Sequence, residues 1–237
     1  MLTNVTAIVK TFERPECLTR LISSLRLYYP ELLVLIADDS RKPIVKTGPN
    51  LQTYGLPYDS GLSVGRNFLL SKVTTDYFLL LDDDFVFTAD TSLESLYAYL
   101  QKGFDLIAGA VRDTQQIPFH IGNIVMLNGQ ASVDIITPVA ELTQCTFVPN
   151  FFMAKTTAVR AVGWKNELKL SEHVDFFARA LGKLKLGYCA SVVIDHNREP
   201  RSPFYRSMRN RTSQFQKLSI PVRTLVRDTR RPFFGRR

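Results

Sequence analysis

The chain has 237 residues, of which 45% are hydrophobic and 22% are charged, a composition typical of a globular protein and not of a disordered or fibrous one. Its formal charge of +8 suggests an anionic partner such as nucleic acid or a membrane, but the charge is unevenly spread. Residues 198–237 contain 12 Lys and Arg against 2 Asp and Glu, whereas residues 1–197 carry a net charge of −2. The sequence therefore predicts a slightly acidic domain at residues 1–197 and a basic, aromatic C-terminal tail at residues 198–237.

From the sequence we expect neither a membrane-spanning helix nor a secretory signal. It has no run of about 18 uncharged apolar residues, the length that a membrane-spanning helix needs. Residues 1–12 lack the basic region and the long apolar core of a secretory signal. The three cysteines are an odd number without the spacing of metal ligands, which favours reduced thiols. We therefore expect a cytoplasmic protein.

Strands and helices alternate through the first half of the chain, because apolar runs of strand length are followed by apolar residues at helical spacing. The predicted elements are, in chain order, a strand at 5–9, a helix from Pro15 to Pro30, a strand at 32–37, a mostly loop segment at 41–61, a helix from Ser63, a strand at 77–81, a helix from a capping box at Thr91 and Glu94 to Gly103, and a strand at 105–111. Such alternation predicts an α/β fold with a mostly parallel central sheet.

The second half of the predicted domain has a different pattern. Between residues 118 and 150, short apolar runs are separated by turn residues, which indicates hairpins rather than further strand–helix units. Helices at 156–162 and 172–182 and a strand at 187–194 complete the predicted domain.

Polar residues follow three of the predicted strands, at the point where each strand ends. They are Thr11, Asp38, Asp39 and the triplet Asp82-Asp83-Asp84. Because ligands bind outside the carboxyl ends of the strands in an open α/β sheet, we expect these side chains to converge on a binding site. Three adjacent carboxylates repel one another, and Mg²⁺ or Mn²⁺ would relieve that repulsion. A solvated acidic turn is the alternative, but the apolar residues 85–87 that follow favour a partly buried site.

The acidic triplet and its surroundings resemble the metal-binding D-x-D region of the GT-A glycosyltransferases. With further motifs, the chain is closely similar to the β-1,4-N-acetylgalactosaminyltransferases that make GM2/GD2-type glycans. The similarity runs in collinear order over roughly residues 3–197, through Lys10-Thr11-Phe12, Ile36-Ala37-Asp38-Asp39-Ser40, Gly65-Arg66-Asn67, residues 73–88, Gly109-Ala110-Val111-Arg112, Asn150-Phe151-Phe152, Val162-Gly163-Trp164, His173-Val174-Asp175-Phe176-Phe177 and Val193-Ile194-Asp195-His196.

This resemblance implies a GT-A, Rossmann-like nucleotide-sugar-binding fold and a metal-dependent, inverting transferase. The enzyme would move a sugar, with GalNAc as the first candidate, from a UDP-sugar to a hydroxyl group of a glycan or glycolipid acceptor. The positions that match the donor site of the family are Thr11, Phe12, Arg14, Asp38, Asp39, Arg66, Asp82 and Asp83. The metal, Mn²⁺ or Mg²⁺, would be held by Asp84, Asp82 and His196. A transferase that uses UDP-galactose or UDP-glucose is the nearest alternative.

The attacking hydroxyl needs a general base, and residues 171–177 carry two acids and a histidine at the start of a predicted helix. Asp175 is the first candidate, because the acid in this His-x-acid-Phe-Phe arrangement matches the most similar family. Glu172 is the second candidate. His173 could orient or replace it, since many related transferases have an adjacent Glu-Asp pair where this chain has Glu172-His173. The alternative is that the acids only stabilise the helix N-terminus through its dipole.

Two residues are candidates for contacts with the sugars. Trp164, the only tryptophan, would stack on a sugar ring of the acceptor or else pack in the core. Asn150 is the other candidate for the acceptor side of the site, and it could also contact the donor sugar. The segment 112–150 looks shorter than its counterpart in the animal enzymes and lacks their extra cysteines, and acceptor contacts often lie in such variable loops.

The predicted tail interleaves basic and apolar side chains, with ten arginines but only one lysine after residue 200. Such a segment can lie on an anionic bilayer, which predicts a protein held at the inner face of a membrane. A solvated or oligomerising extension is the alternative, and nucleic-acid binding is disfavoured. The animal relatives are anchored in the Golgi and this chain shows no anchor, so we expect a bacterial or viral version or a trimmed catalytic domain. A non-enzymatic basic protein that binds through its tail is the rival hypothesis, but it would gain nothing from carboxylates that converge on a cleft.

Overall fold

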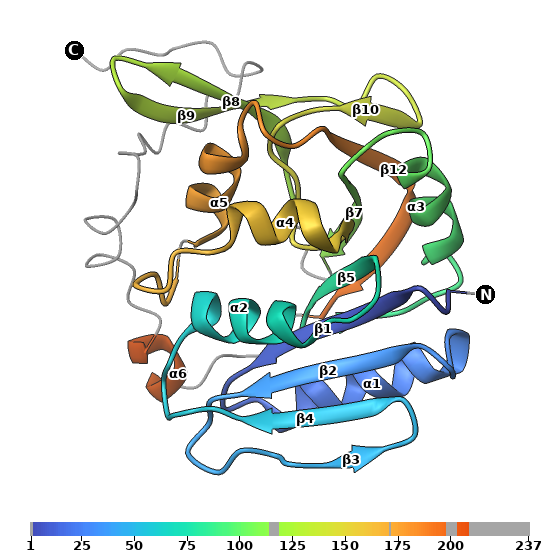
Figure 1. The fold of residues 1–237 in the computed structure, drawn as a ribbon, viewed down its shortest axis with the longest axis vertical. Coiled ribbons are helices and arrows are strands. Elements are labelled where there is room, and N and C mark those ends of the chain that lie inside the picture. Colours follow the sequence, from blue (N-terminus) through green and yellow to red (C-terminus); the bar gives the residue numbers. More distant parts are fainter. Residues whose placement is uncertain (1, 114–118, 171, 198–202, 209–237) are drawn as a thin grey trace.

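The computed structural model describes residues 2–113, 119–170, 172–197 and 203–208, which form a central sheet with helices on both faces (Figure 1). The elements in chain order are β1 (Val5–Thr11), α1 (Pro15–Tyr28), β2 (Leu33–Asp38), β3 (Thr47–Gly48), β4 (Leu51–Gly55), α2 (Leu62–Lys72), β5 (Tyr77–Asp82), β6 (Phe85–Val86), α3 (Leu93–Leu100), β7 (Leu106–Asp113), β8 (Ile121–Leu127), β9 (Gln130–Ile136), β10 (Leu142–Gln144), β11 (Phe152–Lys155), α4 (Thr156–Val162), α5 (Glu172–Ala180), β12 (Leu186–His196) and α6 (Pro203–Met208).

The central sheet has the strand order β10-β12-β7-β11-β5-β1-β2-β4-β3, and β6 pairs with β12 beside this path. One block of parallel strands comprises β5, β1, β2 and β4, and a second comprises β7 and β12. Strand β11 joins the two blocks and runs antiparallel to both of its neighbours. The predicted α/β fold with a mostly parallel central sheet is confirmed.

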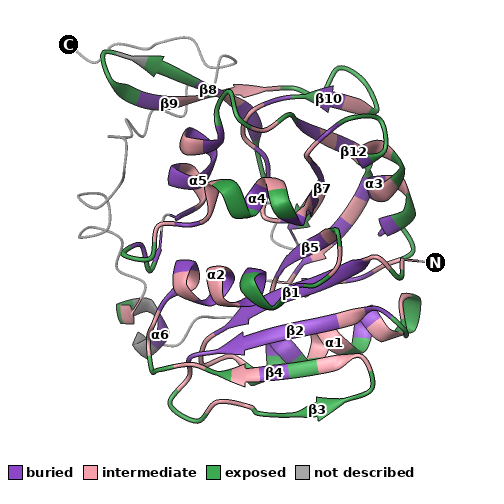
Figure 2. Cartoon of the chain, viewed as in Figure 1, coloured by how far each residue is buried: buried purple, intermediate pink, exposed green. Residues whose placement is uncertain are grey.

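Strand β1 is buried along its whole length, because helices cover both faces of the sheet (Figure 2). Its side chains alternate between two cores. Ile8 packs in the core that contains Leu69 of α2, whereas Val9 packs in the core that contains Leu21 of α1. Burial on both faces explains why the strand reads as a continuous apolar run, and it fixes the position of the polar residues at the strand's end.

Two local predictions differ from the structure. The segment 41–61, expected to be mostly loop, contains β4, which extends the sheet edge in parallel with β2. This strand has no clear apolar pattern because Thr53 is its only buried residue. The helix expected to start from a capping box at Thr91 is capped by Ser92 instead. The Thr91 hydroxyl donates to the Val193 carbonyl at 2.6 Å, so this residue ties the start of α3 to β12.

The hairpin expected between residues 118 and 150 is present as a separate two-stranded sheet, β8 and β9. Its turn, Asn128-Gly129, has positive φ at both residues (50° and 73°), the conformation that this residue pair favours. The three cysteines are buried and form no disulfide with one another.

Part of the predicted tail is described by the structure. Residues 203–208 form α6, whereas 198–202 and 209–237 lie outside the described residues. Within the described part of the chain, no helix is long and apolar enough to cross a membrane.

Candidate active site

The carboxyl ends of β1, β2 and β5 meet at one edge of the sheet, as the sequence predicted. Thr11 pairs in register with Asp38, and Lys10 pairs with Asp82. The Thr11 hydroxyl donates to Oδ2 of Asp83 at 2.7 Å, which joins the acidic triplet to the end of β1. The polar strand ends therefore form one connected site.

Asp84 comes next to His196 because the short strand β6 pairs with the end of β12, with Phe85 opposite His196. Nε2 of His196 lies 3.2 Å from Oδ2 of Asp84, and Nδ1 lies 2.7 Å from Oδ2 of Asp113. Burial lowers the pKa of His196, but the hydrogen bonds and charges of these carboxylates outweigh burial and raise it. A histidine whose second ring nitrogen is held by a carboxylate is the common arrangement of a metal ligand.

The three predicted metal ligands are only partly assembled. Asp84 and His196 face each other, whereas Oδ1 of Asp82 accepts a hydrogen bond from Arg66 at 2.9 Å. Among the described residues, no group of three or more His, Cys, Asp and Glu side chains is arranged to hold a metal ion. Mg²⁺ is often held by one or two carboxylates and completed by substrate phosphates, which suits Asp84, and the ring of His196 beside it is oriented as a metal-ligating histidine usually is.

Arg14 compensates the charge of the other two aspartates. Its guanidinium forms an ion pair with Asp83 and donates to Oδ2 of Asp84 at 2.7 Å. Burial raises the pKa of Asp83 to about 6, with Asp84 adding to the rise and Arg14 opposing it. Burial also favours the neutral form of Asp84, but hydrogen bonds from His196 and Arg14 outweigh burial and hold its pKa below the ordinary value. Arginine side chains therefore relieve part of the repulsion between these carboxylates.

Arg66 connects the acidic triplet with helix α5. Its side chain is only 2% exposed, and it donates to Oδ1 of Asp82 at 2.9 Å and to Oε1 of Glu172 at 2.6 Å. The guanidinium also lies 5.8 Å from the ring centroid of Trp164. The contact between Arg66 and the donor diphosphate stays a prediction, because both of these amino groups have protein partners here. In this structure Arg66 fixes Asp82 relative to Glu172.

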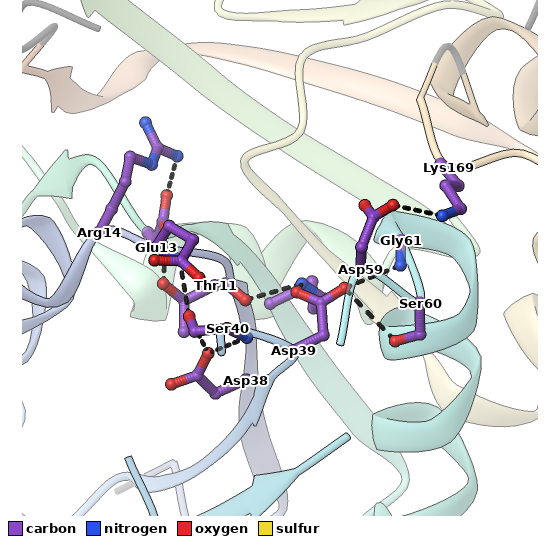
Figure 3. A network of polar contacts seen from close by, with 12 residues as sticks. Thr11, Glu13, Arg14, Asp38, Asp39, Ser40, Asp59, Ser60, Gly61 and Lys169 are labelled. Carbon is purple, nitrogen blue, oxygen red and sulfur yellow. Dashed lines mark hydrogen bonds and ion pairs between the residues drawn. The ribbon is translucent and has the colours of Figure 1, made fainter. Parts of the chain in front are cut away.

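The two aspartates at the end of β2 have different surroundings (Figure 3). Asp38 organises its own loop, since Oδ1 accepts from the backbone N–H of Ser40 at 2.9 Å. Asp39 is buried and accepts from the backbone N–H of Gly61 at 2.8 Å. It also forms an ion pair with Lys10. Burial lowers the pKa of Lys10, and Asp39 opposes that effect.

A cleft of about 330 Å³ opens beside this network, within the size range of about 300–1,000 Å³ for small-molecule sites. It is lined by Thr11, Glu13, Arg14, Pro15, Asp38, Ser40, Arg41, Lys42 and Ile44. Three predicted donor-site residues, Thr11, Arg14 and Asp38, are among them. The charged side chains of Glu13 and the Arg41-Lys42 pair were missed, although they follow the same strand ends, and that position was the feature that could have identified them.

Aromatic rings gather at the end of β1. Phe12, predicted to lie at the nucleotide, is half-buried, with its ring centroid 5.7 Å from that of Tyr58 and 6.4 Å from that of Tyr205. Tyr205 belongs to α6 and is only 4% exposed, so the described part of the predicted tail packs against the site. The predictions did not include this contact, because the interleaved basic and aromatic residues of the tail were interpreted as a membrane-binding segment.

The three candidate bases on α5 differ in their access to a ligand. Glu172 is bound to Arg66, and the side chain of Asp175 is fully buried, with Oδ2 2.7 Å from Nε of Arg179. His173 is half-buried between aromatic rings, 4.8 Å from Phe147 by ring centroids. The choice of Asp175 as the first candidate stays a prediction.

The two predicted acceptor residues also differ in position. Trp164 is 5% exposed and stacks on Phe176 with ring centroids 5.0 Å apart, which matches the alternative of a core residue. Asn150 is half-buried just before β11. Because Phe152 pairs with Leu80 in the antiparallel register, Asn150 lies at the edge of the sheet where β5 ends.

Comparison with known proteins identifies the family. The sequence model of Glycosyl transferase family 2 matches residues 6–149, more than half of the chain. The chain belongs to this family.

The curated relatives agree with the resemblance seen in the sequence. The chain is 38% identical over 215 residues to "Beta-1,4 N-acetylgalactosaminyltransferase 1" of Homo sapiens, covering 84% of this chain and 40% of that protein. It is 36% identical over 200 residues to "Beta-1,4 N-acetylgalactosaminyltransferase 2" of Mus musculus, covering 81% of this chain and 39% of that protein. The chain thus spans about 40% of the length of these relatives.

Solved structures share the fold at low sequence identity. The crystal structure of S. aureus TarS 1-349 has a TM-score of 0.61 and 16% identity, covering 82% of this chain and 60% of that one. The complex of the same protein with UDP-GlcNAc has a TM-score of 0.62 and 15% identity, covering 84% and 60%. These neighbours confirm the predicted GT-A fold.

Proposed function

We propose that this family 2 chain is a metal-dependent, inverting glycosyltransferase that moves a sugar from a UDP-sugar to a hydroxyl group of a glycan or glycolipid. The observation that carries the proposal is the convergence of Asp84, His196 and Arg14 beside a cleft at the carboxyl ends of the strands. GalNAc is the first candidate sugar, because the curated relatives are named N-acetylgalactosaminyltransferases. A structural neighbour complexed with UDP supports the nucleotide.

The cleft supports a binding mode for the donor. Thr11 and Asp38 line it and Phe12 lies next to it, so we assign the nucleoside to this side of the site. Asp39 does not line the cleft, and its contact with Gly61 would hold the start of α2 in position. The diphosphate then extends toward Arg14, whose planar guanidinium suits two phosphate oxygens.

Asp84 and His196 are the residues that would hold a Mn²⁺ or Mg²⁺ ion, and Asp113 would keep the ring of His196 oriented. Such an ion supplies a Lewis acid that stabilises negative charge on the departing diphosphate. Asp82 is the third candidate ligand, with Oδ1 accepting a hydrogen bond from Arg66. Asp83, held by Thr11 and Arg14, would keep the surrounding loop in place.

The acceptor hydroxyl would lose its proton to a base on α5, beside the donor sugar. The variants Glu172→Gln, His173→Gln and Asp175→Asn, each assayed for UDP binding and for transfer, show which of these residues is the base. The variant that lacks the base should bind UDP nearly as well as the original chain and lose transfer. A variant that loses both has instead lost a residue that supports the site, which is the expected result for Glu172 because it is bound to Arg66.

The proposed function is tested with the purified chain, Mn²⁺, a panel of UDP- and GDP-sugars, and a panel of glycan and glycolipid acceptors. We expect acceptor-dependent release of UDP from UDP-GalNAc, and its loss in Asp84→Ala. Turnover with UDP-galactose or UDP-glucose but not with UDP-GalNAc would replace GalNAc as the proposed donor sugar. If no nucleotide sugar binds or reacts, the proposal is wrong and a non-enzymatic role remains.

We further propose that the predicted basic tail holds the domain at an anionic membrane surface, from the ten arginines after residue 200. Truncation after residue 208 keeps α6 and removes most of this charge. The shortened chain should sediment less with anionic vesicles and equally little with neutral ones. Equal sedimentation of both chains with anionic vesicles would reject this surface.

A further inference from the structure

The Arg14 guanidinium lies beside Asp84, one of the two residues proposed to hold the metal ion. Its Nη1 donates to Oδ2 of Asp84 at 2.7 Å, and the same oxygen lies 3.2 Å from Nε2 of His196. A cation bridging the aspartate and the histidine would therefore use an oxygen that the guanidinium already contacts. The two cations would lie within a few ångströms of each other, where like charges repel strongly in a partly buried site.

Two buried carboxylates hold the guanidinium in this position. The side chains of Asp83 and Asp84 are 2% and 8% exposed, and buried carboxylates without a counter-ion are strongly destabilising. Arg14 therefore acts as the counter-ion of Asp83 and Asp84.

Tyr205 of helix α6 also contacts this guanidinium. The Tyr205 ring centroid lies 5.0 Å from Cζ of Arg14, a cation–π distance, and the same ring packs against Phe12. Arg14 also lines the cleft assigned to the donor. A guanidinium that leaves Asp84 thus meets the space into which the donor diphosphate would extend.

We infer that Arg14 is a resident counter-ion that a divalent cation displaces from Asp84, and that the displaced guanidinium then binds the donor diphosphate. Tyr205 stabilises the metal-free position of Arg14, so α6 favours the state without metal. This inference rests on the proposed function for the identity of the donor. It gives Arg14 opposite effects on its two ligands, since it competes with the metal and assists the nucleotide.

The test measures Mn²⁺ binding by electron paramagnetic resonance without nucleotide, and then UDP binding at saturating Mn²⁺ by calorimetry. In Arg14→Met, Mn²⁺ should bind about tenfold more tightly and UDP about tenfold more weakly, within the usual range of coupling between sites. Tyr205→Leu should bind Mn²⁺ about threefold more tightly, because the competing position of Arg14 is weakened. Unchanged or weaker Mn²⁺ binding in Arg14→Met overturns the inference.

Lys155→Met is the matched control, because it removes a cation that is paired with Asp105 at 2.9 Å. Lys155 lies opposite Tyr77 at the start of β5, at the other end of this strand from the acidic triplet. Both affinities should stay at their original values in this variant. If Arg14→Met does not fold, Arg14→Lys takes its place, since it keeps the charge but cannot contact both carboxylates as a planar fork. It should bind Mn²⁺ more tightly than the original chain, and equal or weaker binding overturns the inference. If the original chain binds Mn²⁺ but no UDP, the proposed function fails, while the Mn²⁺ comparison still decides the role of Arg14.

Discussion

Replacing Arg66 with methionine removes the buried cation that joins the acidic triplet to helix α5. Methionine has a similar length and fills much of the same space, so the change mainly removes charge and hydrogen bonds. It leaves Glu172, whose side chain is 4% exposed, without its 2.6 Å partner. Asp82 is 32% exposed on its side chain, so water can take over part of its lost contact.

The expected cost comes mostly from Glu172. Breaking a buried ion pair by removing one partner costs about 3–5 kcal/mol, because the remaining charge is buried without compensation. We therefore expect Arg66→Met to lower the free energy of unfolding by about 3 kcal/mol, at the lower end of that range because Asp82 can be hydrated. Adding Glu172→Gln removes the orphaned charge, and the double variant should recover more than about 1 kcal/mol of the loss.

Urea denaturation, followed by circular dichroism in EDTA, measures these differences. Arg112→Met is the matched control, since this arginine is 54% exposed on its side chain and its surface pairs with Asp90 and Asp195 should contribute less than about 1 kcal/mol each. The reasoning is refuted if Arg66→Met costs no more than the control, or if the double variant is no more stable than Arg66→Met alone.

Three further predictions concern the rest of the site. Gly65→Ala should lower the free energy of unfolding in urea by about 1–3 kcal/mol, because the new Cβ would lie 2.3 Å from Cδ of Lys10. Gly48→Ala is the control, since its Cβ would meet no atom within 4 Å and the loss of stability should be smaller. Equal losses in the two variants would exclude the clash with Lys10. Asp113→Asn should weaken Mn²⁺ binding in calorimetry by about 10–100-fold, since it loosens the ring of His196, and an unchanged affinity would exclude that role. In EDTA the melting temperature should fall as the pH rises from 5 to 8. The pKa of His196 is raised in the fold, so protonated His196 stabilises the fold fully below pH 6.5, and this stabilisation is lost as the pH rises through the raised pKa. His196→Gln should show a smaller fall, and an equal fall would contradict the raised pKa of His196.

The sequence predicted the sheet and the edge that carries the site, because the strands are buried on both faces and read as continuous apolar runs. The end of each run marked the polar residues that converge, from Thr11 to Asp84. Strand β4 was missed for the opposite reason, since an exposed edge strand with one buried side chain, Thr53, has little apolar pattern.

The sequence pattern did not predict which side chains would contact one another within the site. Asp113 and His196 are 83 residues apart and meet only because β7 and β12 are parallel neighbours. The bridge from Arg66 to Glu172 spans 106 residues, and no local spacing predicts it. Tyr205 was counted with a basic tail, although its ring is buried against the site.

The most direct test of the account is a crystal structure of the chain with Mn²⁺ and UDP, with the metal located by its anomalous scattering. We expect one Mn²⁺ within about 2.5 Å of an Asp84 oxygen and Nε2 of His196, with the diphosphate bound to it and to Arg14. The uridine should lie in the cleft beside Thr11 and Asp38. A metal bound elsewhere, or UDP outside this cleft, would contradict the proposed active site.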